Sequence, residues 1–130
     1  MNRLAIVAAL IILASCSGET NYESFIQNRT DRDIIILLYN DGFPRGDTLR
    51  ISSNSTKSIS RGSSNQAEEE EPDCAERIDS AFVEIDGGGT LEKDISISAN
   101  WQVETDKTQN IPEKFDHKCT FSINDSDITE

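Results

Sequence analysis

Residues 115–123 read Phe-Asp-His-Lys-Cys-Thr-Phe-Ser-Ile, and this stretch decides the fold class. Phe115, His117, Cys119, Phe121 and Ile123 alternate strictly with polar residues. Successive side chains of a β-strand point to opposite faces, so a period of two predicts a strand with one buried face. Cys119 belongs to that buried face.

Short β-type segments continue outward from this strand. Residues 34–39 read Ile-Ile-Ile-Leu-Leu-Tyr, and such a run predicts a central strand that is covered on both faces. Turn-forming residues at 40–46 end it. Further strands are expected at 25–28, 48–52, 56–61, 81–85, 91–98 and 101–103.

The segments between these strands carry weaker signals. Asp86-Gly87-Gly88-Gly89 predicts a hairpin turn, after which Ile95 and Ile97 face inward. Residues 75–78 favour a short helical turn, and residues 104–113 a polar loop. No segment after residue 16 has a helical stripe of convincing length.

These patterns predict an all-β chain: an antiparallel β-sandwich of immunoglobulin-like type with about seven strands. A small β-barrel is the alternative. A chain of 130 residues has the length of one domain, which we expect at 22–130.

The charge balance is strongly acidic. The 24 Asp and Glu residues against 12 Lys and Arg give a net charge of −12, which excludes a nucleic-acid backbone as the partner. Four of the acids, Glu68–Glu71, stand together in residues 62–73. Adjacent like charges repel, so we expect a mobile surface loop that buries nothing and whose residues 62–71 can be deleted at little cost.

The N-terminus has the pattern of an export signal. Arg3 precedes an unbroken apolar run from Leu4 to Ala14, which is too short to span a bilayer as a helix. The following residues, Leu13-Ala14-Ser15-Cys16, resemble the lipobox of bacterial lipoproteins. The resemblance implies a signal peptide at 1–15, lipid (palmitate-type acyl chains) on Cys16, and a membrane anchor, followed by a polar tether through residue 21.

Cleavage before Cys16 leaves 115 residues with a side-chain charge of −13 and two remaining cysteines, Cys74 and Cys119. An even pair in an exported protein predicts a disulfide, because the periplasm and cell exterior are oxidising. Two free buried thiols are the competing interpretation. Zinc is disfavoured because the two cysteines and His117 supply only three ligands without the usual close spacing.

The chain as a whole resembles the small uncharacterised lipoproteins of Bacteroidetes-type bacteria. The lipobox, the segment 28–34 leading into an isoleucine-rich strand, and the acidic ending 121–128 carry this resemblance. It implies a cell-envelope location, with Ser17 after the cysteine favouring the outer membrane on its periplasmic or surface face. It implies no activity.

Candidate chemical sites are few. The only imidazole is His117, which we interpret as a packed structural residue, since nucleophilic catalysis needs a base beside a nucleophile. Gly87–Gly89 lacks the strand-to-helix context of a phosphate loop. Glu68–Glu71 and Asp125-Ser126-Asp127 supply oxygen ligands for calcium, but without an EF-hand pattern we favour a solvated acidic surface.

Two O-glycosylation patterns of these bacteria, Asp-Ser/Thr followed by a small apolar residue, place candidate sites at Thr48 and Ser80. We expect no catalytic residue, cofactor or metal. The predicted function is a lipid-anchored binding or structural module that is not an enzyme, with an unknown protein or glycan ligand. The alternative is an acidic inhibitor of a cationic hydrolase such as lysozyme.

Overall fold

The computed structural model describes residues 17–40 and 43–130, which form nine β-strands, two short 3-10 turns and no α-helix. Residues 1–15 and Cys16, on which the signal-peptide and lipidation predictions fall, lie outside the described residues. None of the helices in the described part is long and apolar enough to cross a membrane. The elements are β1 (Glu19–Asn28), β2 (Ile34–Asn40), β3 (Phe43–Ile51), β4 (Ser55–Ser64), β5 (Ser80–Ile85), β6 (Thr90–Leu91), η1 (Ser98–Asn100), β7 (Gln102–Asn110), β8 (Glu113–Ile123), η2 (Asp125–Asp127) and β9 (Ile128–Thr129).

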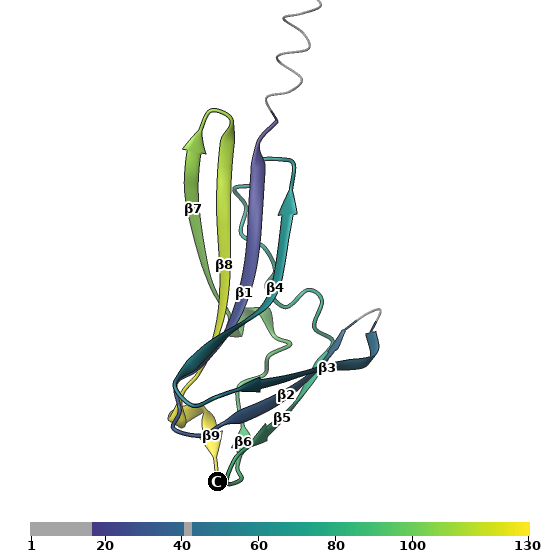
Figure 1. Ribbon diagram of the computed structural model, residues 1–130, viewed down its shortest axis with the longest axis vertical. Helices are drawn as coiled ribbons and strands as arrows, with labels where there is room; N and C mark the ends of the chain where they lie inside the picture. The colour runs from purple at the N-terminus through teal and green to yellow at the C-terminus, as the bar shows by residue number, and fades with distance from the viewer. Residues whose placement is uncertain (1–16, 41–42) are drawn as a thin grey trace, which may run out of the picture.

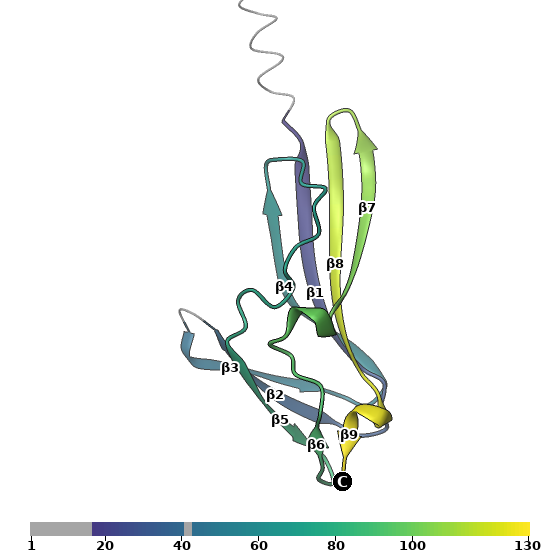
Figure 2. The same cartoon turned by 180° about the vertical axis from the view of Figure 1, so that it is seen from behind.

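The strands form a sandwich of two main sheets, as predicted. One sheet has the order β4-β1-β8-β7, the other β3-β2-β5, and β6 pairs with β9 in a small third sheet. The four-stranded sheet stands along the long axis of the molecule, and the three-stranded sheet runs across its lower end (Figures 1 and 2). Every ladder is antiparallel except β1–β8, which is parallel.

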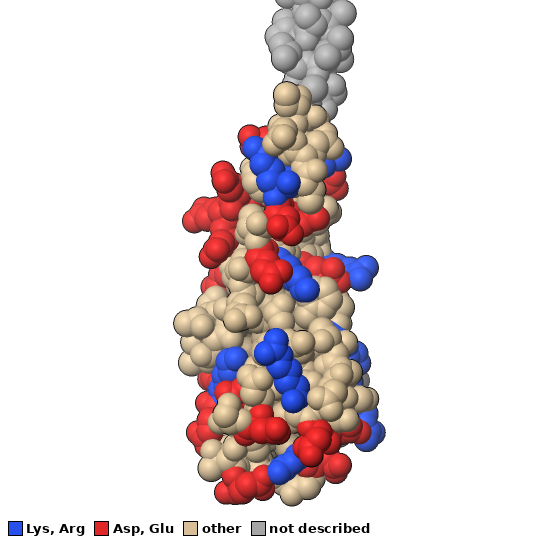
Figure 3. Space-filling view, turned by 90° about the vertical axis from the view of Figure 1, so that its left-hand side faces the viewer, with Lys and Arg blue, Asp and Glu red and all other residues tan. Residues whose placement is uncertain are grey.

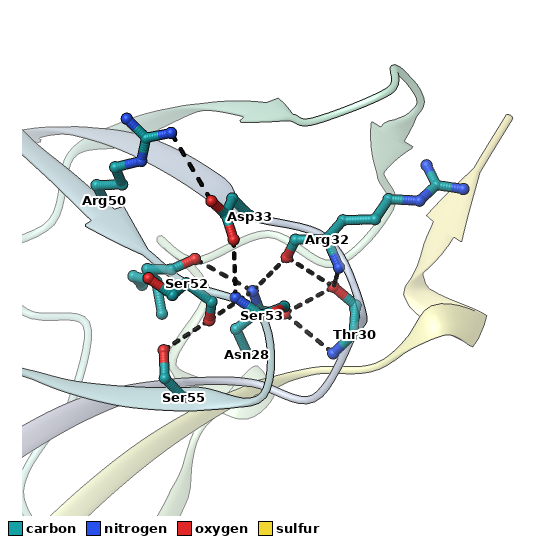
Figure 4. Close-up of polar contacts among 9 residues, drawn as sticks. Asn28, Thr30, Arg32, Asp33, Arg50, Ser52, Ser53 and Ser55 are labelled. Atoms are coloured by element: carbon teal, nitrogen blue, oxygen red, sulfur yellow. Dashed lines mark hydrogen bonds and ion pairs between the residues drawn. The ribbon is translucent and has the colours of Figure 1, made fainter.

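The two sheets are joined by a bent ribbon. Strand β1 pairs with β4 up to Asn28 and Ser55, and β2 pairs with β3 from Ile34 and Ile51 onward. The same two chain segments therefore pass together from one sheet to the other through a corner at residues 29–33 and 52–54 (Figure 4). Strands that change sheets in this way are typical of sheets that cross at a steep angle.

Asn28 holds the corner together from inside. Its side chain is 1% exposed and donates through Nδ2 to the carbonyls of Arg32 (2.7 Å), Ile51 (3.2 Å) and Ser52 (3.2 Å). Its Oδ1 accepts from the backbone N–H (3.0 Å) and the hydroxyl (2.8 Å) of Thr30. Backbone groups that the bend removes from the ladders are thus satisfied by one amide.

The core lies where the sheets cross. Along β8 every second residue from Phe115 to Ile123 is buried, which confirms the predicted alternation. Strand β2 is central in its sheet, as predicted, but only one of its faces is fully covered. The side chains of Ile35 and Leu37 are half-buried and Tyr39 is 40% exposed, because no element of the described chain packs over that face.

Several predicted boundaries are wrong. Strand β1 begins at Glu19 rather than Phe25, and Thr20 is fully buried. Residues 104–113 continue β7 through Asn110 and turn at Ile111–Pro112 into β8 instead of forming a loop. Their polar side chains predicted a loop, but β7 is an edge strand and such a strand needs few apolar residues.

The segment after the glycine turn also differs. Gly87, Gly88 and Gly89 all have positive φ, as a tight turn requires. The returning strand, however, is only Thr90–Leu91, and it pairs with β9 rather than β5. Residues 92–97 run irregularly, with Ile95 buried but Ile97 49% exposed.

Candidate functional site

The acidic segment is held against the sheet. Strand β4 runs to Ser64, and residues 65–73, which we call the strap, then pass across β1 (Figure 2). The strap crosses the face of the sheet on which Thr20 and His117 are buried, and both side chains bind it.

Thr20 fixes the first half of the strap. Its hydroxyl donates to the carbonyl of Gln66 (2.7 Å) and accepts from the backbone N–H of Glu68 (2.8 Å). Thr20 is 0% exposed, so its hydroxyl has no water to bond in place of the strap.

His117 fixes the same point from the neighbouring strand. Its Nε2 lies 2.6 Å from the carbonyl oxygen of Glu68, and its Nδ1 lies 2.7 Å from Oγ1 of Thr105. A carbonyl only accepts, so Nε2 carries a proton and donates to Glu68, while Nδ1 shares a hydrogen bond with the threonine hydroxyl. The ring also stacks on Tyr22, with 5.3 Å between centroids, and the Tyr22 hydroxyl bonds the Glu68 carboxylate. With both nitrogens engaged, the imidazole is a structural clasp.

A disulfide closes the end of the strap. Cys74 and Cys119 are bonded, which confirms the predicted pairing, and Cys119 lies on the buried face of β8. The expectation that nothing in the acidic loop is buried is wrong, since Glu68 is half-buried. The charge pattern of the loop did not reveal this, because Glu69–Glu71 are exposed to solvent while the Glu68 backbone binds the sheet.

We predict that Thr20→Val lowers the free energy of unfolding by about 1–2 kcal/mol, because it removes the two hydrogen bonds by which Thr20 holds the part-buried strap. Urea unfolding measures the change. The control is Thr56→Val at an exposed position of β4, where the same exchange should change stability by less than about 0.5 kcal/mol. Equal effects of the two substitutions would show that the strap is not held by Thr20.

The outer face of the four-stranded sheet has a shallow hollow of about 550 Å³. Part of its charge is paired across strands. Glu23 bonds Arg61 at 2.7 Å and lies opposite Lys118, whose Nζ is 5.0 Å from the centroid of the Phe25 ring. Acidic and basic side chains are likewise interspersed along the face seen from the β7 side (Figure 3).

A second hollow, of about 690 Å³, lies between β5 and residues 89–96. We call it the β5 groove. Within it Ser96 donates both its hydroxyl (2.7 Å) and its N–H (2.8 Å) to Asp94, and these bonds lower the pKa of that carboxyl. Asp94 therefore carries its charge at neutral pH. Phe82 stands on the β5 side of the groove and is 60% exposed.

The other predicted candidates are scattered over the described chain. Thr48 on β3 and Ser80 at the start of β5 are exposed, as a glycan acceptor must be. Asp127 is engaged by the backbone N–H of Asn124 (2.8 Å), in a different part of the fold from the strap. Within the described ranges no group of three or more His, Cys, Asp or Glu side chains is placed to hold a metal ion.

Sequence reasoning missed Thr20 and Asn28, both buried polar residues. The only indication of them in the sequence was that each is a polar residue at a strand position whose side chain must face inward. Comparison with known proteins adds nothing to these sites, because no family model, curated protein or solved structure matches the chain.

Proposed function

We propose that the chain is a lipid-anchored lipoprotein of the bacterial cell envelope, held at the outer membrane, which serves as a binding or structural module and not as an enzyme. The observation that carries the proposal is the run Leu13-Ala14-Ser15-Cys16 at the end of an eleven-residue apolar stretch.

The position of β1 supports a short attachment. Only Ser17 and Gly18 separate Cys16 from Glu19, so the lipid would hold the domain within about 10 Å of the membrane surface. Gly18 lies against the Glu113 carbonyl and Ala67, so the β7–β8 turn and the strap share this end. Ile111 in that turn is 87% exposed, which suits contact with the headgroup region.

The opposite end would then face outward. The described chain starts at one end of the long axis and finishes at the other, beside the three-stranded sheet (Figures 1 and 2). A module anchored in this way presents β5 and its groove to the surroundings. The absence of enzymatic activity is supported by His117, whose ring nitrogens are both engaged by structural partners.

Mass spectrometry of the protein extracted from membranes tests the anchor. We expect the mature chain to begin at a lipid-modified Cys16, and Cys16→Ser to leave an uncleaved or unlipidated chain. Ser17→Ala is the matched control and should be processed normally. An unmodified Cys16, or a mature terminus at Ser17, would overturn the anchoring proposal.

The inhibitor alternative draws on the three exposed carboxylates Glu69–Glu71, which the strap presents in a defined place. Charge complementarity would speed association with a cationic hydrolase. A lysozyme assay at low and high salt tests it, and activity that is unchanged by the protein at low salt rejects it.

A further inference from the structure

Strand β5 is an edge strand with an unused side. Within residues 17–40 and 43–130 it pairs with β2 alone, in a continuous register from Ile34–Ile85 to Tyr39–Ser80. The short strand β6, which follows it in the chain, pairs with β9 instead. An unpaired strand edge is a template for another strand.

The register identifies which backbone groups are unused. The N–H of Asp86 donates to the carbonyl of Asp33 (3.0 Å), so at this position β5 turns its backbone groups toward β2. Backbone groups alternate between the two sides along a strand, and the β2–β5 register is continuous from Ser80 to Ile85. The Asp79 N–H, which bonds the Tyr39 carbonyl (2.9 Å), lies before this regular stretch. Ala81 and Val83 therefore direct their N–H and C=O groups toward the free edge.

That edge opens into the β5 groove. Residues 79–83 form one wall and residues 89–96 the other, and the volume of about 690 Å³ falls within the range of known ligand pockets. The six residues of β5 span about 20 Å, which matches a short extended segment.

The groove combines apolar and acidic chemistry. Phe82, 60% exposed, and the half-buried Leu91 offer apolar contacts. Asp79, Glu92 and Asp94 line the groove with carboxylates. Lys93, the one cation among the described lining residues, donates to the carbonyl of Ser122 (2.9 Å) and lies over the Phe121 ring, so its charge is directed to the core side.

We propose that the β5 groove binds an extended segment of a partner protein in which basic and apolar residues alternate, and that this segment adds to β5 as a further strand. Its backbone would pair with Ala81 and Val83, its apolar side chains would contact Phe82, and its basic side chains would meet the carboxylates. This inference rests on the proposed function as a binding module, but it does not depend on the lipid anchor.

A second copy of the chain is the less suitable occupant. Pairing two β5 strands would bring together two grooves lined by carboxylates, on chains that each carry a charge of −13 after processing. Like charges placed in this way oppose association.

The test uses the full chain in mild detergent and a fluorescein-labelled peptide of alternating Lys and Val, about eight residues long. Its twin carries Glu in place of Lys. Fluorescence anisotropy should show the Lys peptide binding at least about tenfold tighter than the Glu peptide, with a smaller difference in about 0.5 M salt.

Three variants locate the binding. Ala81→Pro removes one free-edge N–H that the β2 ladder does not use, and Phe82→Ala removes the exposed ring; each should weaken binding about tenfold or more. Ala81→Ser keeps the N–H and is the matched control. Phe25→Ala, in the hollow of the other sheet, should bind as the wild type does, and circular dichroism melts verify that all variants fold.

Binding that is lost in Phe25→Ala, or kept in Ala81→Pro, would overturn the assignment, as would equal affinity for the two peptides or no binding to either. If sedimentation shows that the chain is a dimer and that Ala81→Pro is a monomer, the free edge of β5 pairs with a second copy of the chain instead. Because the assay needs no lipid, its failure and a failure of the Cys16 experiment are separate results.

Discussion

Asn28→Ala is expected to lower the free energy of unfolding by about 3–5 kcal/mol, a large part of the stability of a domain this size. The substitution removes the buried amide that donates to the carbonyls of Arg32, Ile51 and Ser52 at the corner (Figure 4). The Ser55 hydroxyl still donates to the Ser52 carbonyl (2.6 Å), and the Thr30 hydroxyl lies 3.2 Å from the Arg32 carbonyl. It also removes the acceptor of Thr30. Each uncompensated buried group costs about 1–3 kcal/mol, with some of that recovered by rearrangement or water entry. Chemical denaturation measures the loss.

Asn21→Ala is the matched control for this experiment. Asn21 lies on the same strand and donates to Asp116 at 3.0 Å, but it is exposed, so its loss should change stability by less than about 0.5 kcal/mol. Similar effects at both positions would show that the corner does not depend on the Asn28 amide.

A charged replacement adds a pH dependence. Asn28→Asp keeps the acceptor but turns an anion toward carbonyl oxygens, and burial raises the pKa of such a carboxyl. The folded state then favours the protonated acid, so the variant is least unstable at low pH and loses stability as pH rises above about 4. The difference in stability between Asn28→Asp and the wild type should therefore narrow in acid. A difference that widens in acid would contradict the described environment of Asn28.

The parts of the fold that sequence predicted share one physical origin. On β8 one face packs on the core and the other meets solvent, so composition follows the strand period directly. The same reasoning placed Cys119 inward, where the disulfide requires it. Strand β2 was recognisable for a related reason, since three consecutive isoleucines at 34–36 favour extended backbone.

The parts that sequence missed depend on long-range partners. Thr20 is separated by 46 residues from Gln66, and His117 by 49 from Glu68, so no local pattern announces the clasp. Strand β7 is extended because β8 supplies its ladder, not because its own polar residues favour a sheet. The β5 groove forms because β6 pairs with β9 and does not return alongside β5. The glycine turn between β5 and β6 instead predicts that these two strands form a hairpin.

Loss of the disulfide is expected to cost about 4 kcal/mol, from the entropy of closing a loop across a sequence separation of 45 residues. For a chain of this size that corresponds to a fall in melting temperature of about 15 °C or more. The pair Cys74→Ser with Cys119→Ala removes the bond while keeping a small apolar side chain at the buried Cys119 position. Calorimetry of the wild type with and without reductant should give the same fall as the variant pair.

The strap gives this prediction a local readout as well. Without the bond, the strap depends on hydrogen bonds such as those of Thr20 and His117, and hydrogen exchange at the Glu68 amide should accelerate more than global unfolding explains. The amide of Asn54, which donates to the Thr30 carbonyl (3.0 Å) at the distant corner, is the internal reference and should follow only the global change. Equal acceleration at both amides would mean that the bond acts only on the global stability of the domain, by restricting the unfolded chain. It would then have no separate role in holding the acidic strap against the sheet.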